Sequence, residues 1–405
     1  MPPLGEERSM TRLGVLASAM VALVLAVTGA QAETGPVKIG IVAAFTGPYS
    51  IWGTEYKRGI ELFLDKYNGK DGNPQVEIVY RDDGGDNPAR AKQLAQELIV
   101  RDHVAVLGGE EFTPNALAMT DVINEAKMPF VIFNAATGFI TDRSPYFVRT
   151  AFTLWTNTIP DAKWALQNKI AKVDIVSADY APGTDAVNAF SKVFTEGGGT
   201  VVNVIRVPLG TADFSPYLQR IRDDNVQGLY MFMPNGPMSV GLVKAFAPSG
   251  LGKKVQLMAA AETEERDLKQ VGDAALGIIS SMCYGPYLDN PANTAFVAAY
   301  RAKFGNQMPP FQTVLAWDGM MALMHMVKAT GGKPDGDAMM AAIKGYAWDS
   351  PRGPVSVDPN TRELTQNMYV RRVEKRPDGT LYNKDFFTYH NVKELWHELN
   401  PKKKS

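Results

Sequence analysis

From residue 36 onward, short apolar runs alternate with longer segments in which apolar residues recur every three or four positions. The first run, residues 37–45, reads VKIGIVAAF and predicts a buried strand, whereas residues 53–69 have one apolar face and predict a helix. The apolar residues of that face are Tyr56, Ile60, Phe63, Leu64 and Tyr67. Further strands are expected at 75–83, 104–109 and 129–136, with helices at 87–102 and 114–126. This series predicts a parallel sheet with helices on both faces.

A second series of the same kind starts near residues 147–153. Helices are expected at 157–169, 182–196, 213–224 and 236–247, and strands at 172–178, 201–207, 228–233 and 255–261. A strand-like segment at 277–288 precedes helices near 292–304, 311–329 and 335–345. Strand-like runs with a period near 2 follow at 353–358, 367–382 and 386–391, with the hairpin-turn sequence RPDG at 376–379. The chain therefore contains two similar α/β halves.

The first residues have the pattern of an export signal. Arg8 and Arg12 precede the apolar run LGVLASAMVALVLAVTGA, which ends in Ala30-Gln31-Ala32. A basic start, a short apolar stretch and an A-x-A site are typical of a secretory signal peptide. We expect residues 1–32 to be removed by cleavage after Ala32.

Composition and motifs narrow the class of function. A chain of 405 residues predicts about two domains, and the net charge of −1 gives no reason to expect a nucleic-acid partner. The single cysteine, Cys283, excludes an intrachain disulfide and a thiolate metal cluster. The sequence also lacks the glycine-rich phosphate-binding motifs, H-E-x-x-H and G-x-S-x-G. We therefore expect neither a cofactor nor a metal.

Candidate binding residues follow the predicted strands, because ligands of open α/β sheets bind beyond the carboxyl ends of the strands. Three such loops are FTGPYSIWG at 45–53, GGEEFTPNA at 108–116 and FNAATGF at 133–139. Thr113 and Thr137 supply hydroxyl groups there. Thr113 followed by proline is also typical of a helix N-cap, and capping alone would explain it.

The chain resembles the type I periplasmic solute-binding proteins of branched-chain amino acid ABC transporters, which bind leucine, isoleucine and valine. The resemblance covers the chain beyond the signal peptide. It is carried by VKIGIVAAFTGPYSIWG, YRDDGGDNP, GGEEFTPNALA, INEAKMPFVIFNAAT, FVRTAF, ADFSPYLQRIR and FQTVLAWDGMMAL, in this order. It implies two Rossmann-like three-layer lobes joined by three crossovers, near 148–153, 281–288 and 352–362. The implied N-terminal lobe is 36–150 plus 283–355, the C-terminal lobe is 151–282 plus 356–395, and 396–405 is a tail.

The resemblance also implies roles for single residues. Ala135 and Thr137 match a turn that holds the ligand carboxylate, and Thr113 falls near a serine that does the same. Trp52, Tyr180 and Trp317 match aromatic residues that face the ligand. The chain departs from the family at two positions. Ala261, with Glu262 next to it, stands where the resemblance places the family's ammonium-binding acid, and Pro234 or Asn235 stands where the family often has a tyrosine.

Aromatic residues suggest the kind of ligand. Phe152 and Trp155 follow the first crossover, where hinge packing would explain them equally well. Together with Trp52, Phe112 and other aromatics they would line a cleft, so we expect a small carboxylate that is an aromatic or apolar acid or a branched-chain amino acid. If Glu111 faces that cleft, it would repel a carboxylate and would favour a ligand that bears an amine or a hydroxyl group.

The resemblance implies a monomeric periplasmic protein that closes on its ligand and delivers it to an inner-membrane ABC permease with a cytoplasmic ATPase. Two alternatives stay open. One is a ligand-sensing domain without transport. The other is an exported enzyme that uses Glu110 with Glu111, or Glu262 with Glu264, although neighbours on an extended turn point apart and make a poor acid/base pair.

Overall fold

The computed structural model describes residues 35–221 and 225–400. The predicted signal peptide and its cleavage site lie outside these residues. Within them, no helix is both long enough and apolar enough to cross a membrane. The residues from Val37 onward form one compact unit, which contains two α/β lobes built on separate sheets.

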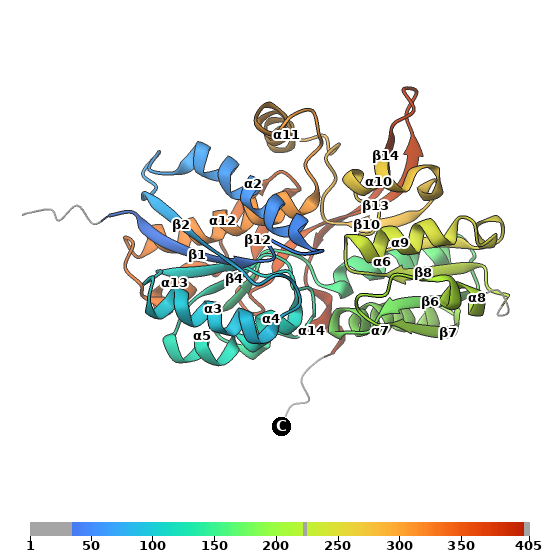
Figure 1. Ribbon diagram of the computed structural model, residues 1–405, viewed down its shortest axis with the longest axis horizontal. Helices are drawn as coiled ribbons and strands as arrows, with labels where there is room; N and C mark the ends of the chain where they lie inside the picture. Colours follow the sequence, from blue (N-terminus) through green and yellow to red (C-terminus); the bar gives the residue numbers. More distant parts are fainter. Residues whose placement is uncertain (1–34, 222–224, 401–405) are drawn as a thin grey trace, which may run out of the picture. The chain divides into compact units, whose positions relative to one another are not determined.

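The sheet of the first lobe has five parallel strands in the order β2-β1-β3-β4-β5 (Figure 1). The strands are β1 (Val37–Ala43), β2 (Val76–Asp82), β3 (Val106–Gly109), β4 (Phe130–Ile132) and β5 (Phe147–Arg149). The helices after them are α2 (Ser50–Tyr67), α3 (Pro88–Val100), α4 (Thr113–Ala118) and α5 (Thr120–Ala126). The predicted parallel sheet with helices on both faces is confirmed.

The second lobe is built on a sheet in the order β11-β12-β13-β10-β9-β8-β6-β7, with β14 paired to β13. Its parallel part comprises β6 (Lys172–Ala178), β7 (Thr200–Val207), β8 (Gly228–Phe232), β9 (Gln256–Ala259) and β10 (Ile279–Met282). The helices are α6 (Leu154–Gln167), α7 (Ala181–Glu196), α8 (Ser215–Ile221), α9 (Pro237–Phe246) and α10 (Glu265–Val271). In Figure 1, α7 and α9 cover opposite faces of this sheet.

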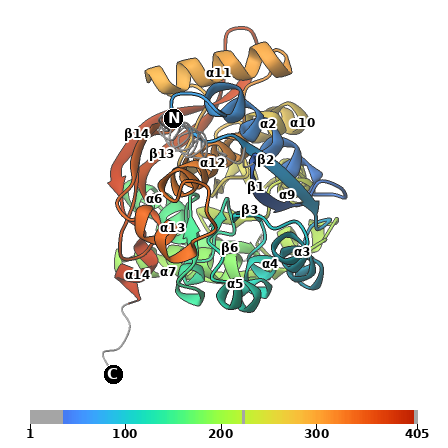
Figure 2. The ribbon, with the colours of Figure 1, turned by 90° about the vertical axis from the view of Figure 1, so that its left-hand side faces the viewer.

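After β10 the chain returns to the first lobe. It forms α11 (Pro291–Phe304), α12 (Phe311–Ala329) and α13 (Gly336–Ala342), and α12 packs along α2 and against β3 (Figure 2). It then forms the antiparallel strands β11 (Ala347–Ser350), β12 (Gly353–Val357), β13 (Leu364–Lys375) and β14 (Leu381–Val392). The β13–β14 turn confirms the RPDG prediction, because the N–H of Gly379 donates to the carbonyl of Arg376 at 2.9 Å.

The expected tail at 396–405 is wrong for residues 396–400. Helix α14 (Leu395–Leu399) is capped by Glu394, whose carboxylate accepts from the N–H groups of Trp396 and His397 at 2.5 and 2.9 Å. The Trp396 ring packs on Phe139, 6.2 Å between centroids. Packing of the Trp396 side chain therefore holds residues 395–399 against the rest of the protein. Residues 401–405 lie outside the described part.

The only cysteine of the sequence, Cys283, is fully buried. Its Sγ lies 3.3 Å from Nη1 of Arg352, whose guanidinium forms an ion pair with Asp318 at 2.7 Å. Burial raises the pKa of the Cys283 thiol despite this cation. The thiol is thus protonated and shielded in the folded protein.

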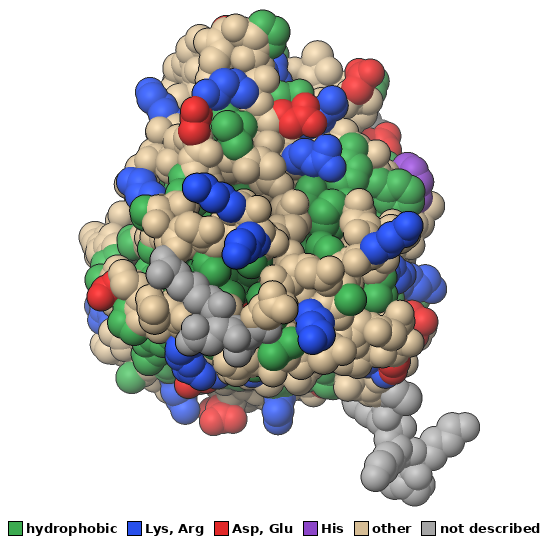
Figure 3. Space-filling view, turned by 90° about the vertical axis from the view of Figure 1, so that its right-hand side faces the viewer, with side chains coloured by type: hydrophobic (Ala, Val, Ile, Leu, Met, Phe, Trp, Pro, Cys, Tyr) green, Lys and Arg blue, Asp and Glu red, His purple; other side chains and the backbone are tan. Residues whose placement is uncertain are grey.

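Charged side chains of both signs lie on the face shown in Figure 3, where Lys, Arg, Asp and Glu surround groups of apolar side chains. This mixed surface agrees with the net charge of −1.

Candidate ligand-binding site

A cavity lies between the two lobes, beyond the carboxyl ends of β3 and β4 on one side and of β8 and β9 on the other. It holds about 470 Å³ of space free of atoms, part of it open to solvent. The lining residues are Trp52, Glu111, Phe112, Asn134, Ala136, Phe152, Leu154, Asn157, Tyr180, Pro182, Phe232, Met233, Pro234, Asn235, Ala260, Ala261 and Phe311. Strand ends at a domain interface are the usual place for a ligand in this class of fold.

Glu111 enters the cavity because of the backbone at the end of β3. Gly109 has φ +115°, and a Cβ there would lie 2.1 Å from the carbonyl oxygen of Val42, so only glycine fits. Glu110 follows with φ +61° and lies beside Asp83 and Asn115, outside the cavity lining. The turn therefore separates the two adjacent glutamates.

The carboxyl of Glu111 is buried, and only one of its two oxygens has a hydrogen-bond partner among the described residues. Oε1 accepts from the N–H of Ala44 at 3.0 Å, whereas Oε2 has no hydrogen-bond partner among the described residues. Burial, and then the nearby charge of Asp83, raise the pKa of Glu111 well above its usual value. Its surroundings therefore favour the protonated, neutral form of the carboxyl.

Asn134 lies beside Glu111 at the end of β4. Its Nδ2 donates to the backbone carbonyl of Glu111 at 3.2 Å, which fixes the orientation of the amide. Its Oδ1 is buried and has no partner in the described part of the chain. Buried polar atoms are nearly always hydrogen-bonded, so this oxygen is available to a ligand or a water molecule.

The turn after Asn134 is held by a buried arginine. Nη1 of Arg149 donates to the carbonyls of Ala135 and Thr137 at 2.8 and 2.6 Å, and Arg149 pairs with Glu363 at 2.6 Å. Ala135 has φ +23°, a backbone angle that residues other than glycine rarely adopt. Arg149 thus braces the turn that carries Ala136 into the cavity.

The second lobe contributes Asn157 from the first turn of α6. Thr153 caps this helix, since its Oγ1 accepts from the N–H of Thr156 at 3.1 Å. The Asn157 side chain is fully buried, and neither of its amide atoms has a partner among the described residues. Asn157 therefore offers both a donor and an acceptor from the lobe opposite Glu111.

Aromatic rings form much of the cavity wall. Tyr180 stacks on Phe232 with 6.0 Å between centroids, and Trp52 and Phe152 each contact Phe311 edge to face. Trp52 is only 4% exposed, and its Nε1 has no acceptor in the described residues. The cavity therefore combines flat apolar walls with a few buried, uncommitted polar atoms.

Comparison with known proteins identifies the family. The sequence profile of the periplasmic binding proteins matches residues 36–380. The chain is 44% identical, over 92% of its length and 96% of the relative, to Leu/Ile/Val-binding protein homolog 6 of Brucella melitensis. The chain belongs to the periplasmic binding protein family.

Solved structures agree with this membership. An ABC transporter solute-binding protein of Rhodopseudomonas palustris HaA2 in complex with p-hydroxybenzoic acid has TM-score 0.86 and 44% identity, over 89% of this chain and 98% of that one. A second, from R. palustris BisB5 in complex with 3,4-dihydroxybenzoic acid, has TM-score 0.84 and 41% identity over the same shares. The predicted resemblance and the two-lobe fold class are confirmed.

The structure of this binding protein brings half of the predicted site residues together. Six of them line the cavity, namely Trp52, Glu111, Phe112, Phe152, Tyr180 and Asn235. Thr113, Ala135, Thr137 and Glu262 are buried next to lining residues but do not line the cavity themselves.

Thr113 is not the helix N-cap. Phe112 occupies the cap position of α4, and Thr113 Oγ1 donates to Thr137 Oγ1 at 3.1 Å. The hydroxyl groups of the two predicted carboxylate-binding loops therefore bind each other. This bond joins the loops after β3 and β4.

Glu262 lies behind the cavity wall of the second lobe. Its Oε1 accepts from the N–H of Met233 at 2.7 Å, and Asn235 Nδ2 donates to the carbonyl of Ala261 at 2.6 Å. Burial raises the pKa of Glu262 to about 8. Glu262 is therefore neutral at pH 7 and supports the segments that carry Met233 and Ala261.

Two predicted aromatic residues lie elsewhere, so their assignment to the cavity is wrong. Trp317 packs among Phe63, Tyr67 and Phe296 between α2, α11 and α12. Trp155 packs with Ile159 and with α14 residues. Both lie on helices whose apolar side packs against another helix. The spacing of apolar residues predicts such a side but not what it packs against.

The sequence analysis missed the asparagines and some of the rings. Asn134 lies within the predicted loop at 133–139, but neither it nor Asn157, Phe232 or Phe311 is predicted to bind the ligand. A usable signal existed for Asn134, because it directly follows a predicted strand. Asn157 carried no such signal, because the start of its helix was expected three residues too late.

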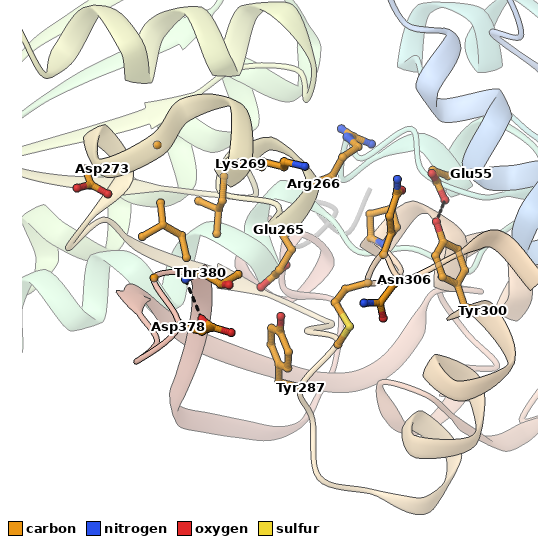
Figure 4. A pocket seen from close by; sticks show the side chains of 17 residues that line it. Glu55, Glu265, Arg266, Lys269, Asp273, Tyr287, Tyr300, Asn306, Asp378 and Thr380 are labelled. Carbon is orange, nitrogen blue, oxygen red and sulfur yellow. Dashed lines mark hydrogen bonds between the residues drawn. The ribbon is translucent and has the colours of Figure 1, made fainter. Parts of the chain in front are cut away.

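A larger groove, with about 1480 Å³ of space free of atoms, lies elsewhere, between α10, the β13–β14 turn and the loop before α12 (Figure 4). Most of its ionisable groups have partners within the protein, although Glu265 Oε2 and Arg266 Nη1 have none among the described residues. Glu55 accepts from Arg58, Tyr300 and Thr313, and Asp378 accepts from the N–H of Thr380 at 2.9 Å. The smaller cavity at the strand ends is the better ligand site despite its size.

Within the described residues, no group of three or more His, Cys, Asp or Glu side chains is arranged to hold a metal ion. The acidic pairs considered for catalysis are divided by the fold. Glu111 lines the cavity while Glu110 does not, and Glu264 pairs with Arg371 at 3.7 Å rather than with Glu262. The site is suited to binding.

Proposed function

We propose that this protein binds a small carboxylate with an aromatic ring in the cavity between its lobes and delivers it to an inner-membrane ABC permease with a cytoplasmic ATPase. The observation that carries the proposal is the cavity itself, in which aromatic walls surround buried polar atoms without protein partners. A flat ligand buries its ring against Tyr180, Phe152 and Phe311, which is worth about 25 cal/mol per Å² of apolar surface.

The carboxylate requires donors, and no lysine or arginine is among the described residues that line the cavity. The uncommitted donors are Trp52 Nε1 and Asn157 Nδ2, which come from opposite lobes. A carboxylate that accepts from both would join the lobes and favour the closed form, since only that form provides both contacts. The ligands of the R. palustris relatives, p-hydroxybenzoic acid and 3,4-dihydroxybenzoic acid, support this class of compound.

A branched-chain amino acid is the second candidate. The name of the Brucella relatives supports it, and the acceptor atoms Glu111 Oε2 and Asn134 Oδ1 could receive an ammonium group. The aromatic walls of the cavity and the aromatic-acid ligands of the R. palustris relatives favour the aromatic acid over it. We therefore place the aromatic acid first.

Isothermal titration calorimetry of the purified protein with benzoate, 4-hydroxybenzoate, 3,4-dihydroxybenzoate and leucine tests the proposal. We expect micromolar or tighter binding of at least one aromatic acid, about −8 kcal/mol or better, and no measurable binding of leucine. Tight leucine binding without any aromatic acid would refute it. Mass spectrometry of the recovered ligand should show it unchanged, because binding without turnover is proposed.

We also propose that the protein is exported to the periplasm, cleaved after Ala32 and monomeric. The family membership and the signal-peptide pattern of the first 32 residues support this. N-terminal sequencing of protein from the periplasmic fraction should begin at Glu33. Size-exclusion chromatography with light scattering should give the mass of one chain.

A further inference from the structure

Glu111 and Asn134 form a polar pair on the cavity wall of the first lobe. Each is at most 9% exposed, and the amide of Asn134 is bound to the backbone of Glu111 at 3.2 Å. Both residues line the cavity, and one oxygen of each, Glu111 Oε2 and Asn134 Oδ1, has no hydrogen-bond partner among the described residues. The hydrogen-bonding properties of these two oxygens can be assigned separately.

Asn134 Oδ1 can only accept. Its Nδ2 is committed to the Glu111 carbonyl, so the amide cannot turn over without losing that bond. A ligand group that meets Oδ1 must therefore carry a hydrogen.

Glu111 Oε1 already accepts from Ala44 N–H, so a proton on this buried carboxyl would be carried by Oε2. Burial, which raises the pKa of Glu111, favours that protonated form. A ligand group that meets Oε2 must therefore carry a lone pair. One small group satisfies both oxygens together: a hydroxyl donates to Asn134 Oδ1 and accepts from Glu111 Oε2–H. A carboxylate would leave Oδ1 unpaired, and a methyl group would leave both unpaired.

We propose that Glu111 and Asn134 together recognise a hydroxyl group on the ring of the ligand, so that the protein selects hydroxylated aromatic acids over unsubstituted ones. This inference rests on the proposed binding of an aromatic carboxylate and adds the substituent that the site selects. A site built to bond a hydroxyl discriminates against the analogue that lacks it, since buried polar groups are then left unpaired.

The test compares two affinities within one protein, so that a partly unfolded variant cannot imitate the effect. Calorimetry gives the dissociation constants of benzoate, 3-hydroxybenzoate and 4-hydroxybenzoate, and selectivity is the ratio of the benzoate constant to that of the tighter hydroxybenzoate. For the native sequence we expect a ratio of at least about 10. In Asn134→Leu and Glu111→Leu the ratio should fall to about 1–3, because each change removes one partner of the hydroxyl.

Glu111→Gln is the matched control. Its carbonyl can accept from Ala44 and its amide can donate where Oε2–H did, so the ratio should stay within about threefold of the native value. A native ratio near 1, with benzoate bound tightly, would overturn this inference and leave the proposed function intact. Unchanged selectivity in both leucine variants would also overturn it. Failure of all three acids to bind would instead refute the proposed function.

Discussion

The backbone N–H of Phe311 donates to Oε2 of Glu264 at 3.2 Å, which joins the start of α12 in the first lobe to the loop after β9 in the second. Phe311 also lines the cavity, so the same residue faces the proposed ligand and forms the bond between the lobes. In the proposed binding cycle, opening of the lobes would break this bond.

Replacing Glu264 tests this connection. We expect Glu264→Ala to weaken ligand binding about tenfold, equivalent to about 1.4 kcal/mol, because the closed form loses one hydrogen bond. The carbonyl of Glu264→Gln can still accept from Phe311, so this variant should have the higher affinity of the two. Equal calorimetric affinities for both variants would contradict the role of this bond.

Trp52→Phe should weaken binding of an aromatic acid by about 5–20-fold, since the ring is kept and the Nε1 donor is lost. Trp317→Phe is the control, because this tryptophan packs against Phe63 and Phe296 and not on the cavity. It should lower the melting temperature slightly and leave the dissociation constant unchanged. If both variants lost affinity equally, the Nε1 contact would be disproved.

Arg149→Met should lower the free energy of unfolding by about 3–5 kcal/mol, because it leaves the carboxylate of Glu363 buried without its partner. The double variant Arg149→Met/Glu363→Leu should recover most of that loss in urea unfolding. Its ligand affinity should stay low, since the carbonyls of Ala135 and Thr137 no longer have the Arg149 donor. A double variant that bound ligand normally would show that the turn needs no brace.

Protonation of Glu262 should make the stability of the folded protein depend on pH. Its pKa is about 8 in the folded protein against 4.5 for an ordinary glutamate, so between these values the native state holds a proton that the unfolded chain has released. The native state is thus favoured at low pH, and stability falls as pH rises from about 4.5 to about 8. Glu262→Gln, whose carbonyl can still accept from Met233, should gain melting temperature over the native protein more at pH 8 than at pH 5. An equal difference at both pH values would contradict the raised pKa.

Gly109→Ala should destabilise the protein by more than ~3 kcal/mol, because the added Cβ meets the carbonyl of Val42 at 2.1 Å. Gly210 also has positive φ, +81°, but has nothing within 4 Å of an added Cβ, so Gly210→Ala should cost only about 1–2 kcal/mol. Urea unfolding of both variants measures the difference. Similar losses would mean that φ alone, and not the close approach of β1, determines the requirement for glycine.

Much of the fold could be predicted from the sequence where the apolar periodicity of a segment and the residues that start or end it indicate the same element. The strand at 172–178 and the helix at 311–329 have the expected bounds, and in the second case Pro310 precedes the helix and Thr330 with two glycines follows it. Errors arose where local signals were weak. The expected single helix at 114–126 is divided at Met119 into α4 and α5, and the polar helix α10 and the short strand β11 were not expected.

The candidate site was less predictable, for a different physical reason. The loops beyond the strands could be located because parallel strands end at one edge of a sheet. Which side chains enter the cavity depends on backbone turns such as the positive φ of Glu110, which directs Glu111 and not Glu110 into the lining. The positions of Trp317 and Trp155 depend on which neighbouring helix each helix packs against. Neither property follows from the order of residues along the chain.

The buried thiol of Cys283 has a practical consequence. Because the protein's one native cysteine is shielded and protonated, a thiol-reactive dye would attach almost entirely to a second cysteine introduced at an exposed position. Such a position near the rim of the cavity would place the dye where closure of the lobes changes its surroundings. The folded protein is thus suited, without removal of any native residue, to serve as the recognition element of a fluorescent sensor for its ligand.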